Sequence, residues 1–311
     1  MILFFLGLVQ TLLLLASAPL VVGLIRKTKA RMQGRKGAPI FQPYRDLSKL
    51  FRKDEVISHD SSWLFVLAPY LCLAATILAA SMIPVVHTEV LGPGSDLILI
   101  VYLLMLSRVM LVFSSLEGGS SFGGMGGSRE TMISVLIEPA LLLAIFALVA
   151  LSGSSELGEI SEFINHNGFL IVGPTLLLAG ASFGITVLAE NARIPFDNPA
   201  THLELTMVHE GMVLEYSGKG LAMMEYASWL KLTAFMAILV NGFFSWGISA
   251  DLSLMPLLVS LIAFSLKMGL LIMLIAVLES RMAKVRLFRL PNLLTASFIL
   301  ALLAMITFYI L

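Results

Sequence analysis

The chain has 311 residues, of which 58% are hydrophobic and 13% charged, and its mean hydropathy is +0.95. A water-soluble domain carries about 25% charged residues, so this chain has too little polar surface to cover a soluble globule. Its net charge is zero, and its one cysteine, Cys72, excludes an internal disulfide and a four-thiolate iron–sulfur cluster. Lipid is the expected solvent, and the expected fold class is an all-α polytopic membrane protein.

Eight stretches are long and apolar enough to cross a bilayer as helices, which takes about 20 residues each. They are residues 2–25, 63–86, 96–116, 130–152, 168–190, 230–248, 254–278 and 293–311. The first has no positive charge before it and a dense basic stretch after it, so we expect an uncleaved helix. We find no internal repeat. The sequence therefore predicts a single transmembrane domain over residues 1–311.

The distribution of Lys and Arg supports this count of spans. Seventeen of the 20 basic residues lie in the loops after spans one, three, five and seven, and ten of them lie between residues 26 and 53. The loops after spans two, four and six carry none. By the positive-inside rule the basic loops are cytoplasmic, which places both termini outside the inner membrane. The predicted cytoplasmic loops are 26–62, 117–129, 191–229 and 279–292.

Three cytoplasmic segments have recognisable patterns. Residues 41–55 place apolar side chains on one helical stripe, which predicts a short amphipathic surface helix. The glycine-rich segment 118–127 lacks the Lys-Ser/Thr ending of a phosphate loop, and we expect a flexible turn there. In the third segment, Pro195 and Pro199 are expected to end the preceding helix, with helix again over 201–214.

Ionisable residues at membrane depth are costly, so each is a candidate functional residue. The candidates for a proton relay are Arg108, Glu117, Glu130, Glu138, Glu190, Lys267 and Glu279. Glu130 and Glu138 lie about 12 Å apart along one helix, a gap that one or two waters can bridge. The alternative is a set of structural ion pairs, such as Arg108 with Glu117 or Lys267 with a carboxylate. Lys231 is expected to extend to the interface.

The long cytoplasmic loop is acidic. Its carboxylates are Asp197, Glu204, Glu210 and Glu215, and it also holds His202 and His209. The spacing of these residues does not match a metal site, so an acidic vestibule or a solvated face is expected, with no metal and no cofactor. No catalytic nucleophile stands out. The residues alone indicate a membrane subunit that handles protons or ions.

Several long motifs resemble one protein family. The segment from Glu190 to Gly218, ENARIPFDNPATHLELTMVHEGMVLEYSG, resembles the signature of the complex I membrane subunit that links the quinone site to the membrane arm. The segments GRKGAPIFQPYRDLSKLF, SRETMISVLIEP and MEYASWLKL agree with it. The resemblance covers nearly the whole chain and implies the same eight-helix topology.

The first cytoplasmic loop distinguishes two branches of this family. In complex I, a longer segment that shapes the quinone entrance separates the two motifs that are here Arg35–Pro39 and Gln42–Asp46. This shortened loop resembles the hydrogenase branch, of the formate hydrogenlyase subunit 4 and hydrogenase-4 component C type, as does the segment 281–287. The stretch between Pro199 and Glu215 is slightly longer than in that branch, which leaves the correspondence of Glu204 and Glu210 open.

The resemblance implies a non-catalytic subunit of a group 4 [NiFe] hydrogenase. Its partners would be a hydrogenase-like large subunit, a small subunit and a ferredoxin-like subunit, which would carry the [NiFe] centre and iron–sulfur clusters, and antiporter-like membrane subunits. Partner docking is expected at Arg35, Lys36, Arg45, Asp46 and Arg193. The alternatives are the quinone-site subunit of an NADH:quinone oxidoreductase-like complex, a stand-alone ion or proton transporter, and a purely structural anchor.

Overall fold

The computed structural model describes residues 2–58, 61–90, 94–167, 169–197, 207–249 and 252–310. Within them, eight helices are long and apolar enough to cross a membrane, and there is no β-strand. The long helices are α1 (Ile2–Met32), α3 (Trp63–Ser81), α4 (Leu97–Glu117), α5 (Ser121–Ser152), α7 (Phe169–Glu190), α9 (Gly218–Ile238), α10 (Leu254–Arg281) and α11 (Leu290–Ile310). The all-α polytopic prediction is confirmed.

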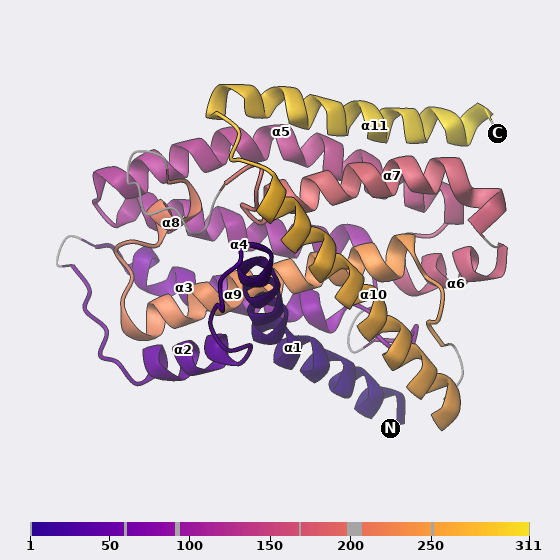
Figure 1. Ribbon diagram of the computed structural model, residues 1–311, viewed down its shortest axis with the longest axis horizontal. Helices are drawn as coiled ribbons and strands as arrows, with labels where there is room; N and C mark the ends of the chain where they lie inside the picture. Colours follow the sequence, from indigo (N-terminus) through magenta and orange to yellow (C-terminus); the bar gives the residue numbers. More distant parts are fainter. Residues whose placement is uncertain are drawn as a thin grey trace.

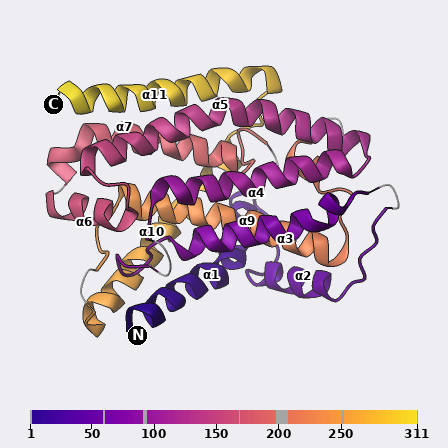
Figure 2. The ribbon, with the colours of Figure 1, turned by 180° about the vertical axis from the view of Figure 1, so that it is seen from behind.

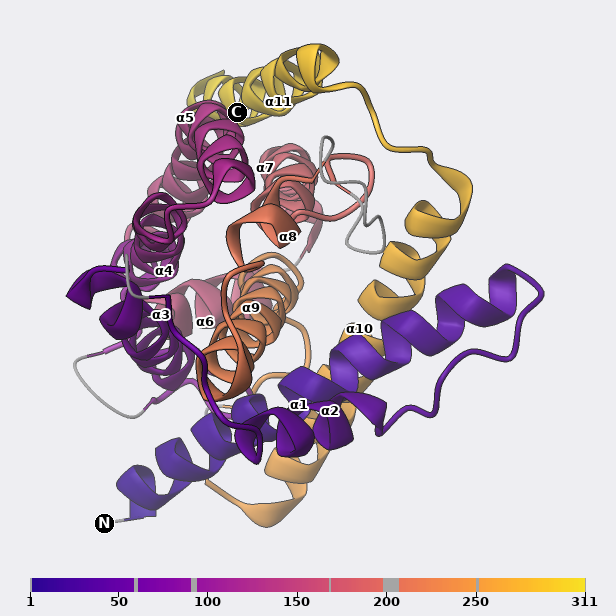
Figure 3. The same cartoon turned by 90° about the vertical axis from the view of Figure 1, so that its left-hand side faces the viewer.

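The long helices form one bundle (Figure 1). Viewed along the bundle, α3, α4, α5 and α11 form an outer arc, α7 and α9 lie inside it, and α1 and α10 cross at the open side (Figure 3). The arc is seen from its outer face in Figure 2. Helix α9 packs on both α1 and α3, and α11 packs on α5 and α7. Helix α9 is therefore surrounded by the rest of the bundle.

The short helices mark the two ends of the bundle. Helices α2 (Gln42–Phe51) and α8 (His209–Met212) lie at one end, and α6 (Leu157–Asn167) lies at the other, toward which both termini point (Figure 1). We call these the α2 end and the α6 end. Helix α2 confirms the amphipathic helix predicted from residues 41–55. Helix α6 had no counterpart among the predictions.

Side-chain caps fix where several long helices begin. Ser62 accepts a hydrogen bond from Leu64 N (3.2 Å), and Asp96 accepts one from Ile98 N (2.9 Å). Such caps satisfy amides that lack a partner within the helix. Toward the α6 end, α9 continues as a π-helical stretch, Leu239–Phe243. A 3₁₀ turn, Leu287–Arg289, leads into α11.

Two of the predicted loops contain helix. The flexible turn expected over residues 118–127 is wrong, because Ser120 caps α5 and the helix runs from Ser121 through the glycines. Residues 218–229, expected as loop, are the first three turns of α9. Of the helix expected over 201–214, the structure has α8, while residues 201–206 lie outside the described residues. At both places the polar and small residues favoured a loop in the sequence analysis, although the segments are helical.

Aromatic side chains fill the middle of the bundle. The ring of Phe183 on α7 lies 6.2 Å from that of Phe235 on α9 and 5.1 Å from that of Phe243. All three are fully buried. They form an apolar layer between the polar groups near the two ends.

Candidate functional site

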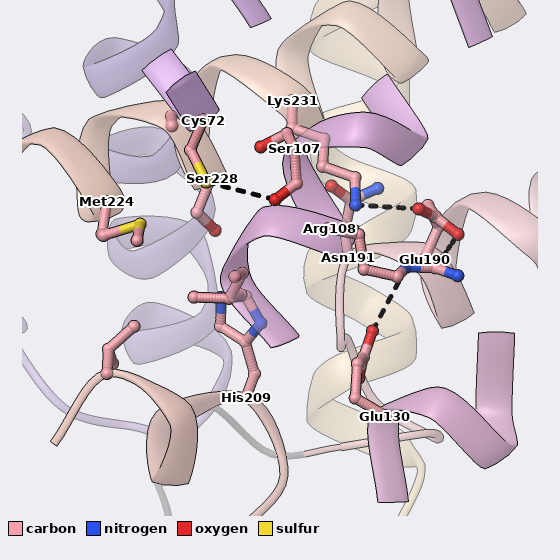
Figure 4. A pocket seen from close by; sticks show the side chains of 13 residues that line it. Cys72, Ser107, Arg108, Glu130, Glu190, Asn191, His209, Met224, Ser228 and Lys231 are labelled. Atoms are coloured by element: carbon pink, nitrogen blue, oxygen red, sulfur yellow. Dashed lines mark hydrogen bonds and ion pairs between the residues drawn. The ribbon is translucent and has the colours of Figure 1, made fainter. Parts of the chain in front are cut away.

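Four buried charged side chains from four helices meet toward the α2 end (Figure 4). Arg108 of α4, Glu130 of α5 and Glu190 of α7 are each 4% exposed, and Lys231 of α9 is 8% exposed. The guanidinium of Arg108 lies 3.4 Å from Glu130 Oε1 through Nε and contacts Glu190 Oε2 through Nη2. Lys231 Nζ lies 2.8 Å from Glu190 Oε1. We call these four residues the charge cluster.

The glycines of α5 bring the charge cluster together. A Cβ atom at Gly123 would lie 2.6 Å from the carbonyl oxygen of Ser115 on α4, and one at Gly126 would lie 2.8 Å from the carbonyl oxygen of Val208. Real Cβ atoms do not approach other atoms so closely, so only glycine permits this contact between α5 and its neighbours. Glu130, one to two turns further on, is thereby held beside Arg108.

The sequence argument found three members of the cluster but not their partners. Arg108 pairs with Glu130 and Glu190 instead of Glu117, which is exposed at the end of α4. The expectation that Lys231 extends to the interface is wrong. Because α9 begins at Gly218, Lys231 lies about 20 Å along the helix and is buried.

A small pocket of about 30 Å³ adjoins the charge cluster. Its polar lining includes Ser107, Asn191 and His209 as well as the four charged side chains (Figure 4). Cys72 also lines it, and its thiol donates to the carbonyl of Ser107 at 3.2 Å. A polar pocket of this size has room for about two water molecules. Water in it could carry protons between the carboxylates.

A larger cavity of about 510 Å³ opens toward the α2 end from the small pocket. The two share the lining residues Asn191, His209, Val213, Met224 and Ser228. Eight charged residues besides His209 line the larger cavity: Arg26, Lys29, Arg35, Arg193, Asp197, Glu210, Glu225 and Glu279. Trp229, which lies beside Arg26, also lines it.

This lining makes the cavity a polar vestibule that leads from the α2 end to the charge cluster. We call it the vestibule. Asp197 and Glu210 of the predicted acidic loop line it, and the vestibule holds as many basic residues as carboxylates. Because it holds both carboxylates and basic side chains, this lining can interact with a positive or a negative charge placed in the vestibule.

Two titratable groups of the vestibule have shifted pKa values. Burial, together with the neighbouring carboxylates Glu225 and Asp197, raises the pKa of Glu210 to about 7. Burial lowers the pKa of His209, an effect that the carboxylate of Glu130 opposes. A carboxyl that titrates near neutral pH can take up or release a proton under physiological conditions. Glu210 is therefore suited to exchange protons at the α2 end.

Ion pairs tie the wall of the vestibule to neighbouring helices. Glu279 of α10 accepts from Lys29 of α1 at 2.9 Å and from Arg193 at 3.2 Å. Lys284 donates to Asp197 at 2.5 Å. The segment 191–197 is therefore held to both α1 and the region after α10.

The other predicted relay and loop residues lie apart from the charge cluster. Glu138 is half-buried two turns further along α5 and within electrostatic range of Arg108, and no hydrogen bond joins it to a described residue. Glu215 is exposed, and Glu204 lies outside the described residues. Nothing in the structure connects Glu117 or Glu215 to the charge cluster.

Lys267 forms a second polar site, toward the α6 end. Its Nζ donates to Asn241 Oδ1 at 3.1 Å and to the carbonyl of Phe244 at 2.9 Å, and lies 5.2 Å from the centre of the Trp246 ring. Asn241 belongs to the π-helical stretch and donates to the carbonyl of Pro84 at 2.7 Å. The predicted alternative, a carboxylate partner for Lys267, is not found among the described residues.

The five predicted docking residues differ in their exposure and in the side-chain contacts that they make. Lys36 and Arg45 are exposed, and Arg35 is exposed at the vestibule with its Nε bonded to Gln33. Asp46 accepts from Gln42 at 2.8 Å, and Arg193 pairs with Glu279. No group of three or more potential metal ligands occurs among the described residues.

Comparison with known proteins places the chain in a family. The model of the NADH dehydrogenase family matches residues 5–310. The chain belongs to this family. It is 35% identical to hydrogenase-4 component C of Escherichia coli over 96% of this chain and 93% of that protein. It is 33% identical to formate hydrogenlyase subunit 4 of the same organism, over 96% and 97%.

A solved structure agrees. A chain of the membrane-bound sulfane sulfur reductase, an archaeal respiratory membrane complex, matches with a TM-score of 0.84 and 25% identity, covering 97% of this chain and 99% of that one. The resemblance to the hydrogenase branch of the complex I subunit family is confirmed, and the chain is a multi-pass membrane protein.

Proposed function

We propose that this chain anchors the redox arm of an energy-converting group 4 [NiFe] hydrogenase or formate hydrogenlyase to the membrane and couples its chemistry to proton movement. At a coarser level, the chain is a membrane subunit of a complex I-like energy-converting complex. The observation that carries the proposal is the charge cluster at the end of a vestibule that opens toward the α2 end.

The charge cluster is suited to coupling because its charges balance. Two cations and two carboxylates share a buried site, and changing one charge without compensation costs several kcal/mol. A redox step in the partner that alters charge or loop position at the vestibule would therefore be answered by a proton gained or lost at Glu130, Glu190 or Glu210. Glu138, two turns further along α5 and within electrostatic range of Arg108, would extend the route toward an antiporter-like subunit.

The partner arm would dock on the cytoplasmic side, which we assign to the α2 end because most Lys and Arg residues lie there. Arg35 and Lys36 are exposed there and able to orient a charged partner. The [NiFe] centre and iron–sulfur clusters would belong to the large, small and ferredoxin-like subunits. With this orientation both termini of the chain lie outside the inner membrane.

A coupling measurement tests the role of the charge cluster. The complex that co-purifies with this chain is reconstituted in liposomes, and protons translocated per electron pair are measured for Glu130→Gln and Glu138→Gln. We expect at least a tenfold loss of translocation, with electron transfer retained at half its rate or more. Glu117→Gln, an exposed carboxylate, is the matched control. Normal translocation in Glu130→Gln would assign the cluster to structure alone.

Metal analysis of the same complex tests the hydrogenase assignment. We expect nickel and iron in a co-purifying large subunit. Iron without nickel, together with a sulfur-reducing or quinone-linked activity, would keep the coupling role and replace the hydrogenase. A lone chain that transports ions in liposomes would contradict both.

The quinone-site subunit is the second candidate, and the family match favours it. The shortened first cytoplasmic loop, between Arg35 and Asp46, argues for the hydrogenase instead, as does the 35% identity to hydrogenase-4 component C. A quinone-site inhibitor that blocks electron transfer in the purified complex would reverse this preference.

A further inference from the structure

Helix α2 and the two residues that follow it carry four cations that pair with nothing else in the described part of the chain. Arg45, Lys49, Arg52 and Lys53 are all exposed, and no ion pair or side-chain hydrogen bond joins them to a described residue. Some other cations at this end are paired, as Lys29 is with Glu279. The charge on α2 is thus available to an external anion.

The four cations surround a shallow hollow of about 590 Å³. Residues four apart share a helix face, so Arg45 and Lys49 lie together on α2 with Ser48 beside them, and Arg52 and Lys53 line the hollow from just beyond the end of the helix. The Ser48 hydroxyl is exposed between them. Guanidinium, ammonium and hydroxyl donors gathered in this way suit the oxygens of a phosphate group.

The opposite side of α2 is fixed to membrane-crossing helices. Pro43 and Leu47 are buried where α2 packs on α1 and α9. The hydroxyl of Tyr44, whose side chain also lines the hollow, donates to the carbonyl of Ala16 on α1. The hollow is therefore held beside the apolar part of the bundle and cannot swing away from the bilayer.

Aromatic side chains flank the cations. Phe41 is 59% exposed before the helix and Phe51 is 44% exposed at its end, and the Phe41 and Tyr44 rings lie 6.1 Å apart. Exposed aromatics beside a basic helix face are typical of the membrane interface, where the rings reach the acyl region and the cations reach the headgroups. An acidic protein surface would make use of the cations but not of these rings.

We propose that the hollow on α2 binds the headgroup of an anionic phospholipid. Its phosphate is held by Arg45, Lys49, Arg52 and Lys53, and its acyl chains pass along Phe41 and Phe51. This inference is independent of the coupling role. It assigns Arg45 to a lipid and leaves Arg35 and Lys36 for partner docking.

Photo-crosslinking tests the site directly. The complex containing this chain is placed in nanodiscs with photoactivatable phosphatidylglycerol or phosphatidylcholine, and labelled peptides are mapped by mass spectrometry. We expect phosphatidylglycerol to label the segment 41–55 preferentially. Each cation near an anionic lipid contributes about fivefold, so the pair Arg45→Gln with Lys49→Gln lowers this labelling about 25-fold.

Two control variants separate the site from general charge and from misfolding. Arg31→Gln removes an exposed cation outside the hollow and should change labelling less than about twofold. The exchange Arg45→Lys with Lys49→Arg keeps the charge and should retain the preference. Retention of the co-purifying subunits shows that each variant is assembled.

Three results would overturn the proposal. Equal labelling by the two lipids means that the hollow has no headgroup preference. Loss of labelling on addition of millimolar glycerol 3-phosphate makes it a site for soluble phosphate. Loss of a co-purifying subunit from the Gln pair, with lipid labelling unchanged, makes it a protein interface.

Discussion

Toward the α2 end of the bundle, buried charges meet opposite charges, whereas toward the α6 end a buried ammonium meets only neutral groups. Arg108 and Lys231 share the carboxylates of Glu130 and Glu190. Lys267 is satisfied by the amide of Asn241 and a backbone carbonyl. The aromatic layer of Phe183, Phe235 and Phe243 lies between.

The two sites differ in whether a proton can move between their own groups. A group of carboxylates with shared cations can redistribute protons among its own members, and the adjoining pocket has room for water. Lys267 has no carboxylate with which to exchange a proton among the described residues. Its bonds instead join α10 to the π-helical end of α9. We therefore expect the charge cluster to exchange protons and Lys267 to act as a structural link between the two helices.

The largest effect is expected from Glu190→Gln. This change leaves two buried cations with one carboxylate, and removing one member of a buried ion pair costs about 3–5 kcal/mol. We expect a large fall in the thermal unfolding midpoint in detergent and loss of proton translocation. Adding Lys231→Met removes one of the stranded cations and should restore part of the stability. If the double variant is no more stable than the single one, the two residues do not act as a pair.

A smaller effect is expected from Lys267→Met. The methionine side chain ends one atom short of the ammonium and leaves Asn241 Oδ1 and the Phe244 carbonyl without this donor, at a cost of about 1–3 kcal/mol. Proton translocation per electron pair should be unchanged in the reconstituted complex. Loss of translocation with normal stability would make Lys267 a relay residue, as its position in the sequence first suggested, and would remove the distinction between the two ends.

Glu279→Gln tests the rim of the vestibule. Glu279 joins Lys29 and Arg193, whose side chains are 13% and 12% exposed, so the expected loss of stability is about 1 kcal/mol. A double-mutant cycle with Lys29→Met should give a coupling energy of the same order. Faster hydrogen exchange in the segment 191–197 should accompany the loss. Unchanged exchange there would mean that the ion pairs do not hold this wall.

The smallest effect is expected from Glu210→Gln, and it depends on pH. The pKa of Glu210 is about 7 in the folded chain against an ordinary value of 4.5, so the folded state holds its proton more tightly. Wild-type stability should therefore fall as pH rises from about 4.5 to 7, and the variant should lack this fall. Solvent screening limits the gain in the variant to about 1 kcal/mol above pH 7. Parallel stability curves across this range would contradict the shifted pKa.

The spans were predictable because each needs only a run of apolar residues. Arg108, Glu130 and Glu190 were also recognisable one by one, since a charge within an apolar run is rare. Their pairing was not, because it depends on which helices are neighbours. Glu117 is close to Arg108 along α4, but α5 and α7 bring Glu130 and Glu190 closer in space.

Lys231 shows a different limit of sequence reasoning. Its expected place at the interface followed from starting the sixth span at residue 230. Gly218 and the polar residues after it look like a loop, yet they are helical because neighbouring helices bury them. The acidic loop indicated that a polar site lies near it. Half of the charged residues that line the vestibule, however, come from α1, α9 and α10, which lie far apart in sequence.

The glycines of α5 allow close packing between helices, and this packing sets the distances between buried charges. Gly123 and Gly126 carry no charge, yet their missing side chains set how near α5 lies to Ser115 of α4 and to Val208 just before α8. Coulomb energy varies inversely with separation and is strong where water is excluded, so a shift of about 1 Å between these helices changes the Arg108–Glu130 attraction substantially. Residues outside the charge cluster therefore help to determine how strongly its charged groups interact.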